Sequence, residues 1–135
     1  MREKEFETQF EKLAALHNMK YFKIPDVHGA LYAAQKHVPA AKRPFDGILV
    51  TENKIFLIEL KVGSARPKVH QSESLEAANI IHKDCGYVVR KLTDKYRIEK
   101  WRIGVCGIKK VSEKENVCYE CKRITELFNF FGGAE

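Results

Sequence analysis

RPFDGILV (residues 43–50) and IFLIELK (residues 55–61) are the two stretches that decide the fold of this chain. Each is an apolar run of strand-forming residues, and the polar residues 51–54 between them predict a tight turn. Three charged residues, Asp46, Glu59 and Lys61, stand at the ends of these runs. Because a buried charge is costly unless it is paired or holds a metal ion, the two stretches predict a β-hairpin that carries functional groups.

The position of the turn decides which residues face each other across this hairpin. A turn centred on residues 52–53 places Asp46 opposite Glu59, with Cβ atoms roughly 4.5–5.5 Å apart. A turn centred on residues 53–54 places Asp46 opposite Lys61 and diagonal to Glu59. Since strand side chains alternate between faces, Glu59 and Lys61 share one face in both registers. Either register therefore gathers the three groups.

Two carboxylates this close repel each other, which raises a pKa unless a cation lies between them. Mg²⁺ is the expected cofactor, with Mn²⁺ able to substitute, because Mg²⁺ binds carboxylates, keeps several waters and commonly lies beside substrate phosphates. A lysine two residues after the glutamate can hold the attacking water and stabilise charge at phosphorus. The alternative is a salt-bridged cluster at a solvated sheet edge, which contributes little.

The pattern Asp46, twelve residues, then Glu59-Leu60-Lys61 resembles the D…ExK signature of the PD-(D/E)xK nuclease superfamily. One departure is that Phe45 separates Pro44 from Asp46. The resemblance covers about residues 3–92 and implies an α/β fold with a restriction-endonuclease-like core, in which helices flank a central mixed β-sheet. It also implies a Mg²⁺-dependent endodeoxyribonuclease.

Within that superfamily the chain is most similar to small Holliday junction resolvases and related phage endonucleases. Residues 7–18 resemble their opening helix, and His70-Gln71 followed by Leu75 resembles a pattern found after the ExK strand of the bacterial resolvases. The resemblance implies that Asp46 and Glu59 bind the metal and Lys61 assists the nucleophile. The other implied roles are a metal-site carboxylate for Glu7, a backbone metal ligand for Leu60 and a water- or phosphate-steering amide for Gln71.

The first helix has its own signal, because Phe6, Phe10, Leu13 and His17 recur at helical spacing. Glu7 lies near the edge of this apolar stripe and can face inward. The other acidic residues that could complete the site are Glu3, Glu5 and Glu11. Alternatively, all four are solvated charges that favour the positive helix N-terminus.

A second helix is predicted over about residues 68–83, with Pro67 well placed to open it. Gln71 shares a face of this helix with Leu75 and Ala78. At the helix start, its amide either orients a water or phosphate or simply caps backbone groups.

The formal net charge is +6, and basic residues flank the acidic cluster. Basic groups around a metal site suit a polyphosphate substrate such as DNA, although the same charge can serve solubility alone. A second basic cluster spans residues 90–102, and the long predicted loop 25–44 is expected to approach the DNA backbone. The candidate DNA-binding residues are Lys36, Lys42, Arg43, Arg66, Lys68 and His70.

The length of 135 residues predicts a single domain, residues 1–135. No run of about 18 apolar residues is present, so we expect no membrane partner and a cytoplasmic location. Cys118-x-x-Cys121 has zinc-ligand spacing, but a structural site usually needs a second matching pair, so structural zinc is not expected.

Further strands are predicted at 86–92, within 96–111 and near 117–121, followed by a tail helix with Leu127, Phe128 and Phe131 on one face. That face packs on its own sheet or on a partner subunit, and with a junction-resolving role it favours a homodimer. A phage or restriction-type endonuclease, or a nuclease acting on DNA ends, would use the same residues. The alternative of another class is a DNA-binding module without catalysis.

Overall fold

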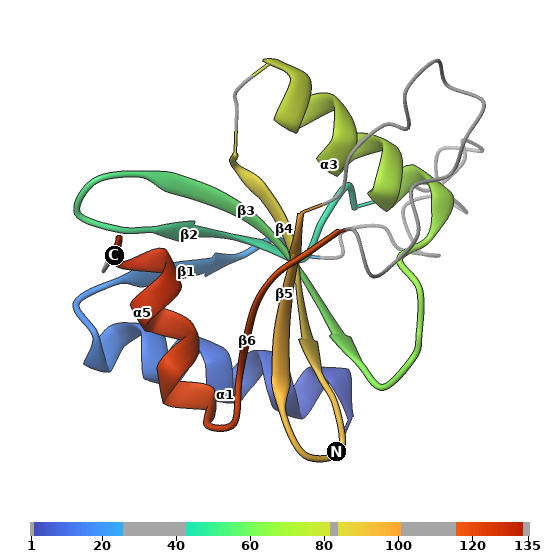
Figure 1. Cartoon of the computed structure of the whole chain (residues 1–135). Helices are drawn as coiled ribbons and strands as arrows, with labels where there is room; N and C mark the ends of the chain where they lie inside the picture. The colour runs from blue at the N-terminus through green and yellow to red at the C-terminus, as the bar shows by residue number, and fades with distance from the viewer. Residues whose placement is uncertain (1, 26–42, 82–83, 101–115, 134–135) are drawn as a thin grey trace, which may run out of the picture.

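The computed structural model describes residues 2–25, 43–81, 84–100 and 116–133, which form a β-sheet with helices on both faces (Figure 1). The helices are α1 (Glu3–Leu16), α3 (Val69–Ile81) and α5 (Leu127–Phe131), with the 3-10 helix η2 (Ile124–Glu126) leading into α5. The strands are β1 (Lys20–Lys23), β2 (Gly47–Val50), β3 (Ile55–Val62), β4 (Gly86–Lys91), β5 (Tyr96–Lys100) and β6 (Val117–Cys121).

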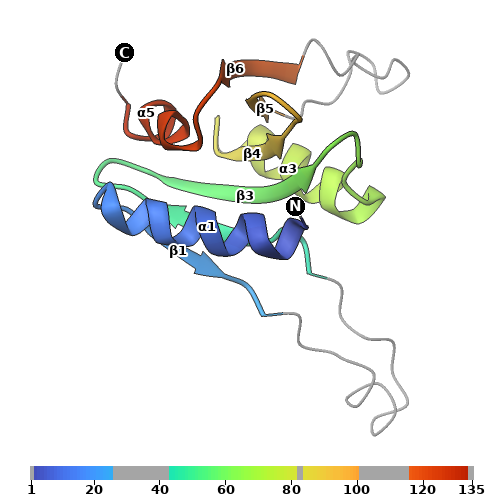
Figure 2. The ribbon, with the colours of Figure 1, turned by 90° about the horizontal axis from the view of Figure 1, so that it is seen from below.

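The described strands form one six-stranded sheet in the order β1-β2-β3-β4-β5-β6. Only β3 and β4 pair in parallel, and the other neighbours in this order are antiparallel. The connection between parallel strands must cross over the sheet, and α3 makes this crossing. Figures 1 and 2 show α3 on one face of the sheet and α1 and α5 on the other. The predicted α/β fold with a mixed sheet is therefore confirmed.

The hairpin β2–β3 has the first of the two predicted registers. Gly47 pairs with Ile58 and Val50 with Ile55, so the next position places Asp46 opposite Glu59. The register that would set Asp46 opposite Lys61 is wrong. Thr51 closes the turn because its backbone N–H and its hydroxyl both donate to the carbonyl of Lys54, each at 2.9 Å.

Helix α1 anchors the sheet face that carries Leu60. Phe6 and Phe10, one turn apart, are fully buried, and Phe10 packs edge-on against Tyr21 of β1. Burying one such side chain contributes about 1.5–3 kcal/mol to the free energy of unfolding. Glu7 lies on the same side of α1 and is buried with them. The packing of α1 therefore fixes where the Glu7 carboxylate can reach.

The tail helix packs on this chain's own sheet. Leu127, Phe128 and Phe131 are buried, and Phe128 contacts Phe10 of α1 at a ring-centroid distance of 5.0 Å. These apolar side chains are therefore part of the core, and they give no support to a dimer interface.

Strand β1 is an element that the sequence patterns did not predict. Asn18 ends α1 with a left-handed φ of 60°, and the chain then runs antiparallel to β2 along the edge of the sheet. Tyr21 points into the core, whereas Phe22 is half exposed. The two adjacent aromatic residues in Lys20–Lys23 favour a strand and are the signal that could have predicted β1.

Cys118 and Cys121 differ in exposure, since Cys118 is exposed on β6 and Cys121 is buried. Cys85 is also a buried free thiol, and Cys106 lies outside the described residues. Within the described ranges no helix has both the length and the apolar character needed to cross a bilayer. Most of the predicted loop 25–44 and the segment 101–111 of the predicted strands also lie outside those ranges.

Candidate active site

The end of the β2–β3 hairpin gathers the three charged groups that the sequence singled out. Asp46 directly precedes β2, and Glu59 and Lys61 lie in β3 on either side of Leu60, whose side chain belongs to the core. Asp46 and Lys61 are each 8% exposed and Glu59 is 1% exposed. The hairpin register therefore brings two carboxylates and one ammonium group out of bulk water.

Both carboxylate oxygens of Asp46 are engaged. Oδ2 accepts a hydrogen bond from the backbone N–H of Leu60 at 2.7 Å, and Oδ1 accepts one from Nη2 of Arg43 at 2.8 Å. Burial raises the pKa of Asp46, and the charge of Glu7 acts in the same direction, while the bonds from Leu60 and Arg43 oppose the rise.

Glu59 is the most deeply buried carboxylate of the site. Its Oε2 lies 3.3 Å from Nζ of Lys61, whereas its Oε1 is buried and accepts no hydrogen bond from the described residues. Burial raises the pKa of Glu59 to about 8, and the neighbouring charge of Asp46 adds to the rise. A buried acceptor without a donor is unfavourable, so the Oε1 atom is positioned to gain from a cation.

Glu7 of α1 is held by two groups from β1. The hydroxyl of Tyr21 donates to Oε2 of Glu7 at 2.6 Å, and Nζ of Lys23 lies 3.3 Å from Oε1. The Tyr21 ring crosses directly over Gly47, where an added Cβ would lie less than 3 Å from the ring atoms. Glycine after Asp46 is therefore needed for Tyr21 to reach Glu7. Burial and the bond to Glu7 raise the Tyr21 pKa, so its hydroxyl stays a donor.

The other acidic residues of α1 differ in their distance from the site. Glu3 approaches the site, with its Oε1 3.7 Å from Nζ of Lys61, whereas Glu5 and Glu11 are exposed. The structure therefore brings Glu7 and Glu3 toward the cluster and leaves Glu5 and Glu11 in solvent.

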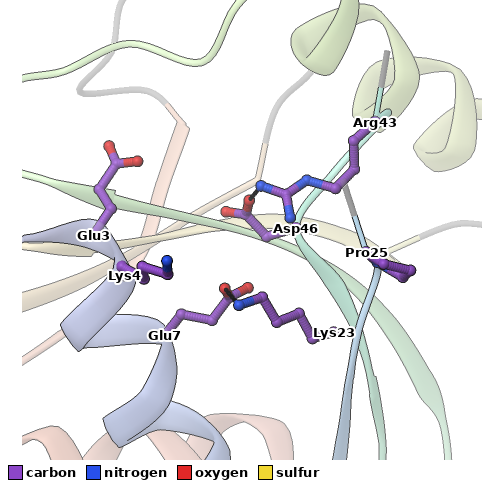
Figure 3. Close-up of a pocket in the computed structure, with 7 residues that line it drawn as sticks. All are labelled: Glu3, Lys4, Glu7, Lys23, Pro25, Arg43 and Asp46. Atoms are coloured by element: carbon purple, nitrogen blue, oxygen red, sulfur yellow. Dashed lines mark hydrogen bonds and ion pairs between the residues drawn. The ribbon is translucent and has the colours of Figure 1, made fainter. Parts of the chain in front are cut away.

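A cleft of about 730 Å³ opens beside these carboxylates. Figure 3 shows Arg43 reaching Asp46 and Lys23 reaching Glu7, so that each of these two carboxylates contacts a basic side chain. Acidic ligands and basic groups thus share one concave surface. The residues that line the cleft are Glu3, Lys4, Glu7, Lys23, Pro25, Arg43 and Asp46.

A divalent metal ion can be matched to part of this donor set. Among the described residues no group of three or more His, Cys, Asp or Glu side chains is arranged to hold a metal. Mg²⁺ needs only one or two carboxylates, since it keeps several waters. Asp46 and Glu59 could supply these carboxylates, and Oε1 of Glu59 is buried without a hydrogen bond from the described residues.

The backbone of Leu60 also suits this site. The N–H groups of Leu57 and Gly63 donate to the carbonyls of Cys85, just before β4, and Lys91, at the end of β4. Successive residues of a strand direct their backbone groups to opposite neighbouring strands. The N–H of Leu60 accordingly points to the β2 side, where it meets Asp46. Its carbonyl points to the same side, so it can add an oxygen ligand to the two carboxylates.

Gln71 and His70, at the start of α3, are engaged with backbone groups. The Oε1 atom of Gln71 accepts from the N–H of Lys68 at 2.9 Å, which is the capping role. Nε2 of His70 lies 3.1 Å from the carbonyl oxygen of Arg43 and so ties α3 to the site. Lys68 and Arg66 are exposed nearby in sequence, and the candidates Lys36 and Lys42 lie outside the described residues.

The basic cluster predicted at residues 90–102 is largely paired with acids. Arg90 is buried against Glu99, and Lys100 pairs with Asp84. Lys95 and Arg97 both pair with the exposed Glu120. In the described part of this cluster, residues 90–100, the acidic partners therefore offset much of the positive charge that the composition predicts.

Neither a protein-family model nor a curated protein matches this sequence. Among solved structures, the chain is similar to a Holliday junction resolvase of the archaeal hyperthermophile Archaeoglobus fulgidus. The similarity covers 93% of this chain and 92% of the resolvase, with a TM-score of 0.51 and 13% sequence identity. The two proteins therefore share an α/β fold with a mixed sheet flanked by helices.

Proposed function

We propose that this protein is a metal-dependent DNA endonuclease that hydrolyses phosphodiester bonds. The observation that carries the proposal is the buried pair formed by Asp46, directly before β2, and Glu59 on β3. One oxygen of Glu59 accepts no hydrogen bond from the described residues. Burying two like charges side by side is unfavourable without a cation, and strongly perturbed carboxylates in a cleft are typical of active sites.

Mg²⁺, or Mn²⁺ in its place, would be held by Asp46, Glu59 and the carbonyl of Leu60, with Glu7 joining directly or through water. When bound, it would acidify a water molecule and offset the charge that develops on the leaving oxygen.

Among the protein side chains, Lys61 would position the attacking water. Its Nζ atom lies 3.3 Å from Glu59 and 3.7 Å from Glu3, so these two side chains fix the position of the ammonium at the edge of the site. A fixed positive group there also stabilises negative charge that builds up at phosphorus. Gln71 would contribute by ordering the start of α3, and its amide nitrogen would steer a water or a phosphate.

DNA is the proposed substrate because basic side chains flank the acidic site. Lys4, Lys23 and Arg43 line the cleft, and Arg66, Lys68 and His70 follow β3. The shared fold with an archaeal Holliday junction resolvase supports branched DNA as the favoured substrate. Resolving a junction takes one cut on each of two strands, so we propose a homodimer with two active sites, acting in the cytoplasm.

The test incubates the purified protein with Mg²⁺ and three matched DNAs: a four-way junction, a linear duplex and a single strand. Symmetric nicks in the junction alone are expected for a resolvase. Equal cutting of the linear duplex would instead indicate a phage- or restriction-type enzyme, and cutting that starts at ends would indicate an end-directed nuclease.

Asp46→Asn and Lys61→Ala are expected to lose cleavage while retaining DNA affinity. Lys122→Ala serves as the matched control, because Lys122 is an exposed cation beyond β6, at the opposite edge of the sheet from β1. Tight DNA binding with no cleavage of any substrate in Mg²⁺ or Mn²⁺ would refute the nuclease and favour a DNA-binding module.

A further inference from the structure

Arg43 holds a position that the proposed reaction does not by itself explain. Its guanidinium joins two segments: Nη2 donates to Oδ1 of Asp46 at 2.8 Å, and Nη1 donates to the backbone carbonyl of Ile24 at 2.9 Å. The side chain of Arg43 is 23% exposed, so the pair is shielded from most of the solvent. Arg43 is thus a fixed partner of Asp46, and it also lines the cleft (Figure 3).

The backbone around Arg43 is anchored as well. Nε2 of His70 lies 3.1 Å from the carbonyl oxygen of Arg43, and the N–H of Ile24 donates to the carbonyl of Asp46 at 2.9 Å. The end of β1, the start of β2 and the start of α3 therefore meet at this arginine. With its backbone held, the part of Arg43 that can respond to a ligand is the guanidinium.

The contact of Arg43 with Asp46 conflicts with a metal at the same carboxylate. Oδ2 of Asp46 already accepts from Leu60, and Oδ1 carries the guanidinium. A Mg²⁺ ion binds oxygen at about 2.0–2.1 Å, so an ion on Oδ1 would lie close to the guanidinium. Two cations at such a separation in a shielded site repel each other strongly. Metal binding and the Arg43–Asp46 pair therefore compete.

A DNA phosphate offers the guanidinium an alternative partner. Arginine binds phosphate oxygens through two parallel N–H donors, which is stronger than its bonds to neutral groups. Arg43 faces the same cleft as the carboxylates, so a phosphate that enters this cleft can take over its donors. Asp46 would then lose its internal counter-ion as the substrate arrives.

We propose that Arg43 is an internal counter-ion that neutralises Asp46 in the absence of metal, and that a substrate phosphate promotes metal binding by drawing Arg43 away. The inference rests on the proposed function and adds a regulatory step to it. Metal and DNA then bind with positive coupling, and linkage requires each to strengthen the other by the same factor. A nuclease built this way assembles its complete metal site mainly on DNA.

The first measurement is Mn²⁺ affinity without DNA, from the electron paramagnetic resonance signal of free Mn²⁺. Arg43→Ala is expected to bind Mn²⁺ roughly tenfold more tightly than the unmodified protein, within the usual range of coupling between sites. Arg43→Gln, which keeps a side chain of intermediate length, gives the same direction if the alanine variant proves poorly folded in thermal unfolding. Lys122→Ala removes one positive charge far from the cleft and should leave the affinity unchanged.

The second measurement is the affinity for a four-way DNA junction, from fluorescence anisotropy with and without Mn²⁺. It is made in a Lys61→Ala background to prevent turnover. Mn²⁺ should strengthen DNA binding roughly tenfold when Arg43 is present and much less when Arg43→Ala is added.

Equal or weaker Mn²⁺ binding by both Arg43 variants would overturn the counter-ion proposal and leave the metal site standing. An equal Mn²⁺ effect on DNA affinity with and without Arg43 would also overturn it. Absence of Mn²⁺ binding in every variant would instead remove the proposed function, and the inference with it.

Discussion

Two regions of the same sheet bury charged side chains, and they differ in how these charges are satisfied. One is the pair Arg90 and Glu99 on β4 and β5, which are 4% and 2% exposed. The other is the pair Asp46 and Glu59 at the β2–β3 hairpin. The first pair joins opposite charges, whereas the second joins like charges.

The Arg90–Glu99 pair is saturated with hydrogen bonds. Nε of Arg90 donates to Glu99 at 2.8 Å, Nη2 donates to the other carboxylate oxygen at 3.3 Å, and Nη1 reaches the carbonyls of Gly63 at 2.7 Å and Ala65 at 2.5 Å. Arg90 therefore fixes the loop that leaves β3 just after Lys61. Within the described part of the chain, neither side chain has a buried polar atom without a hydrogen bond.

The Asp46–Glu59 pair is instead left with unfavourable electrostatics. Both pKa values are raised, and Oε1 of Glu59 has no donor among the described residues. A buried charge therefore indicates a structural role when its hydrogen-bond partners are complete, and a binding site when the protein alone leaves them incomplete.

The largest effect should follow from breaking the saturated pair. Arg90→Ala leaves the buried Glu99 carboxylate without its partner and is expected to cost about 3–5 kcal/mol in the free energy of unfolding, measured in urea. Lys95→Ala is the control, because Lys95 is more exposed and pairs with the exposed Glu120. Similar losses in the two variants would show that burial of the pair carries no special weight.

Glu59→Gln should instead lower activity while leaving the stability of the protein largely intact. Removing a metal-binding carboxylate is expected to lower the rate of DNA cleavage by more than about 100-fold. The free energy of unfolding of the metal-free protein should stay nearly the same at pH 7, because burial raises the pKa of Glu59 to about 8 and the neutral amide replaces a mostly protonated carboxyl. A large loss of stability together with activity would place Glu59 in the same class as Glu99.

The buried carboxyl of Glu59 should also make the stability of the protein depend on pH. The pKa of Glu59 rises from 4.5 to about 8 on folding, so between these values the folded state binds the proton more tightly than the unfolded state. Its contribution to stability is therefore complete below about pH 4.5 and is lost as the pH rises through about 8. In EDTA, the melting temperature should fall between about pH 6 and about pH 9, and Glu59→Gln should reduce this fall. An identical fall in both proteins would assign it to other groups.

The smallest effect concerns the positioning of Glu7. Tyr21→Phe removes the donor to the Glu7 carboxylate and is expected to weaken Mn²⁺ binding severalfold, with a loss of about 1 kcal/mol in stability. Tyr119→Phe is the matched control, since its hydroxyl donates to a backbone carbonyl near the far edge of the sheet. Unchanged Mn²⁺ affinity in Tyr21→Phe would remove Glu7 from the metal site.

Much of the arrangement followed from the sequence, because it depends on local patterns. The apolar runs around Asp46 and Glu59 and the four-residue turn fixed the hairpin, and the choice between its two registers needed the structure. Helical spacing of Phe6 and Phe10 likewise fixed α1 and placed Glu7 near its buried side. Each of these signals comes from residues close together in the sequence, where the spacing of apolar residues indicates a strand or a helix.

The remaining features depend on contacts between distant segments. Tyr21 holds Glu7 because Gly47 leaves space for its ring, and no local pattern encodes that contact. Arg43 looked like a DNA-binding residue from charge alone, and only the fold shows it bonded to Asp46. The basic cluster on β4 and β5 was overvalued for the same reason, since its acidic partners come from other strands and loops.

The most direct test of the central claim is the anomalous X-ray scattering of Mn²⁺ in crystals soaked with that ion. If Asp46 and Glu59 bind the metal together, a peak is expected within bonding distance of both side chains. Ordered density for both side chains with no peak between them, at a Mn²⁺ concentration that supports DNA cleavage, would contradict it.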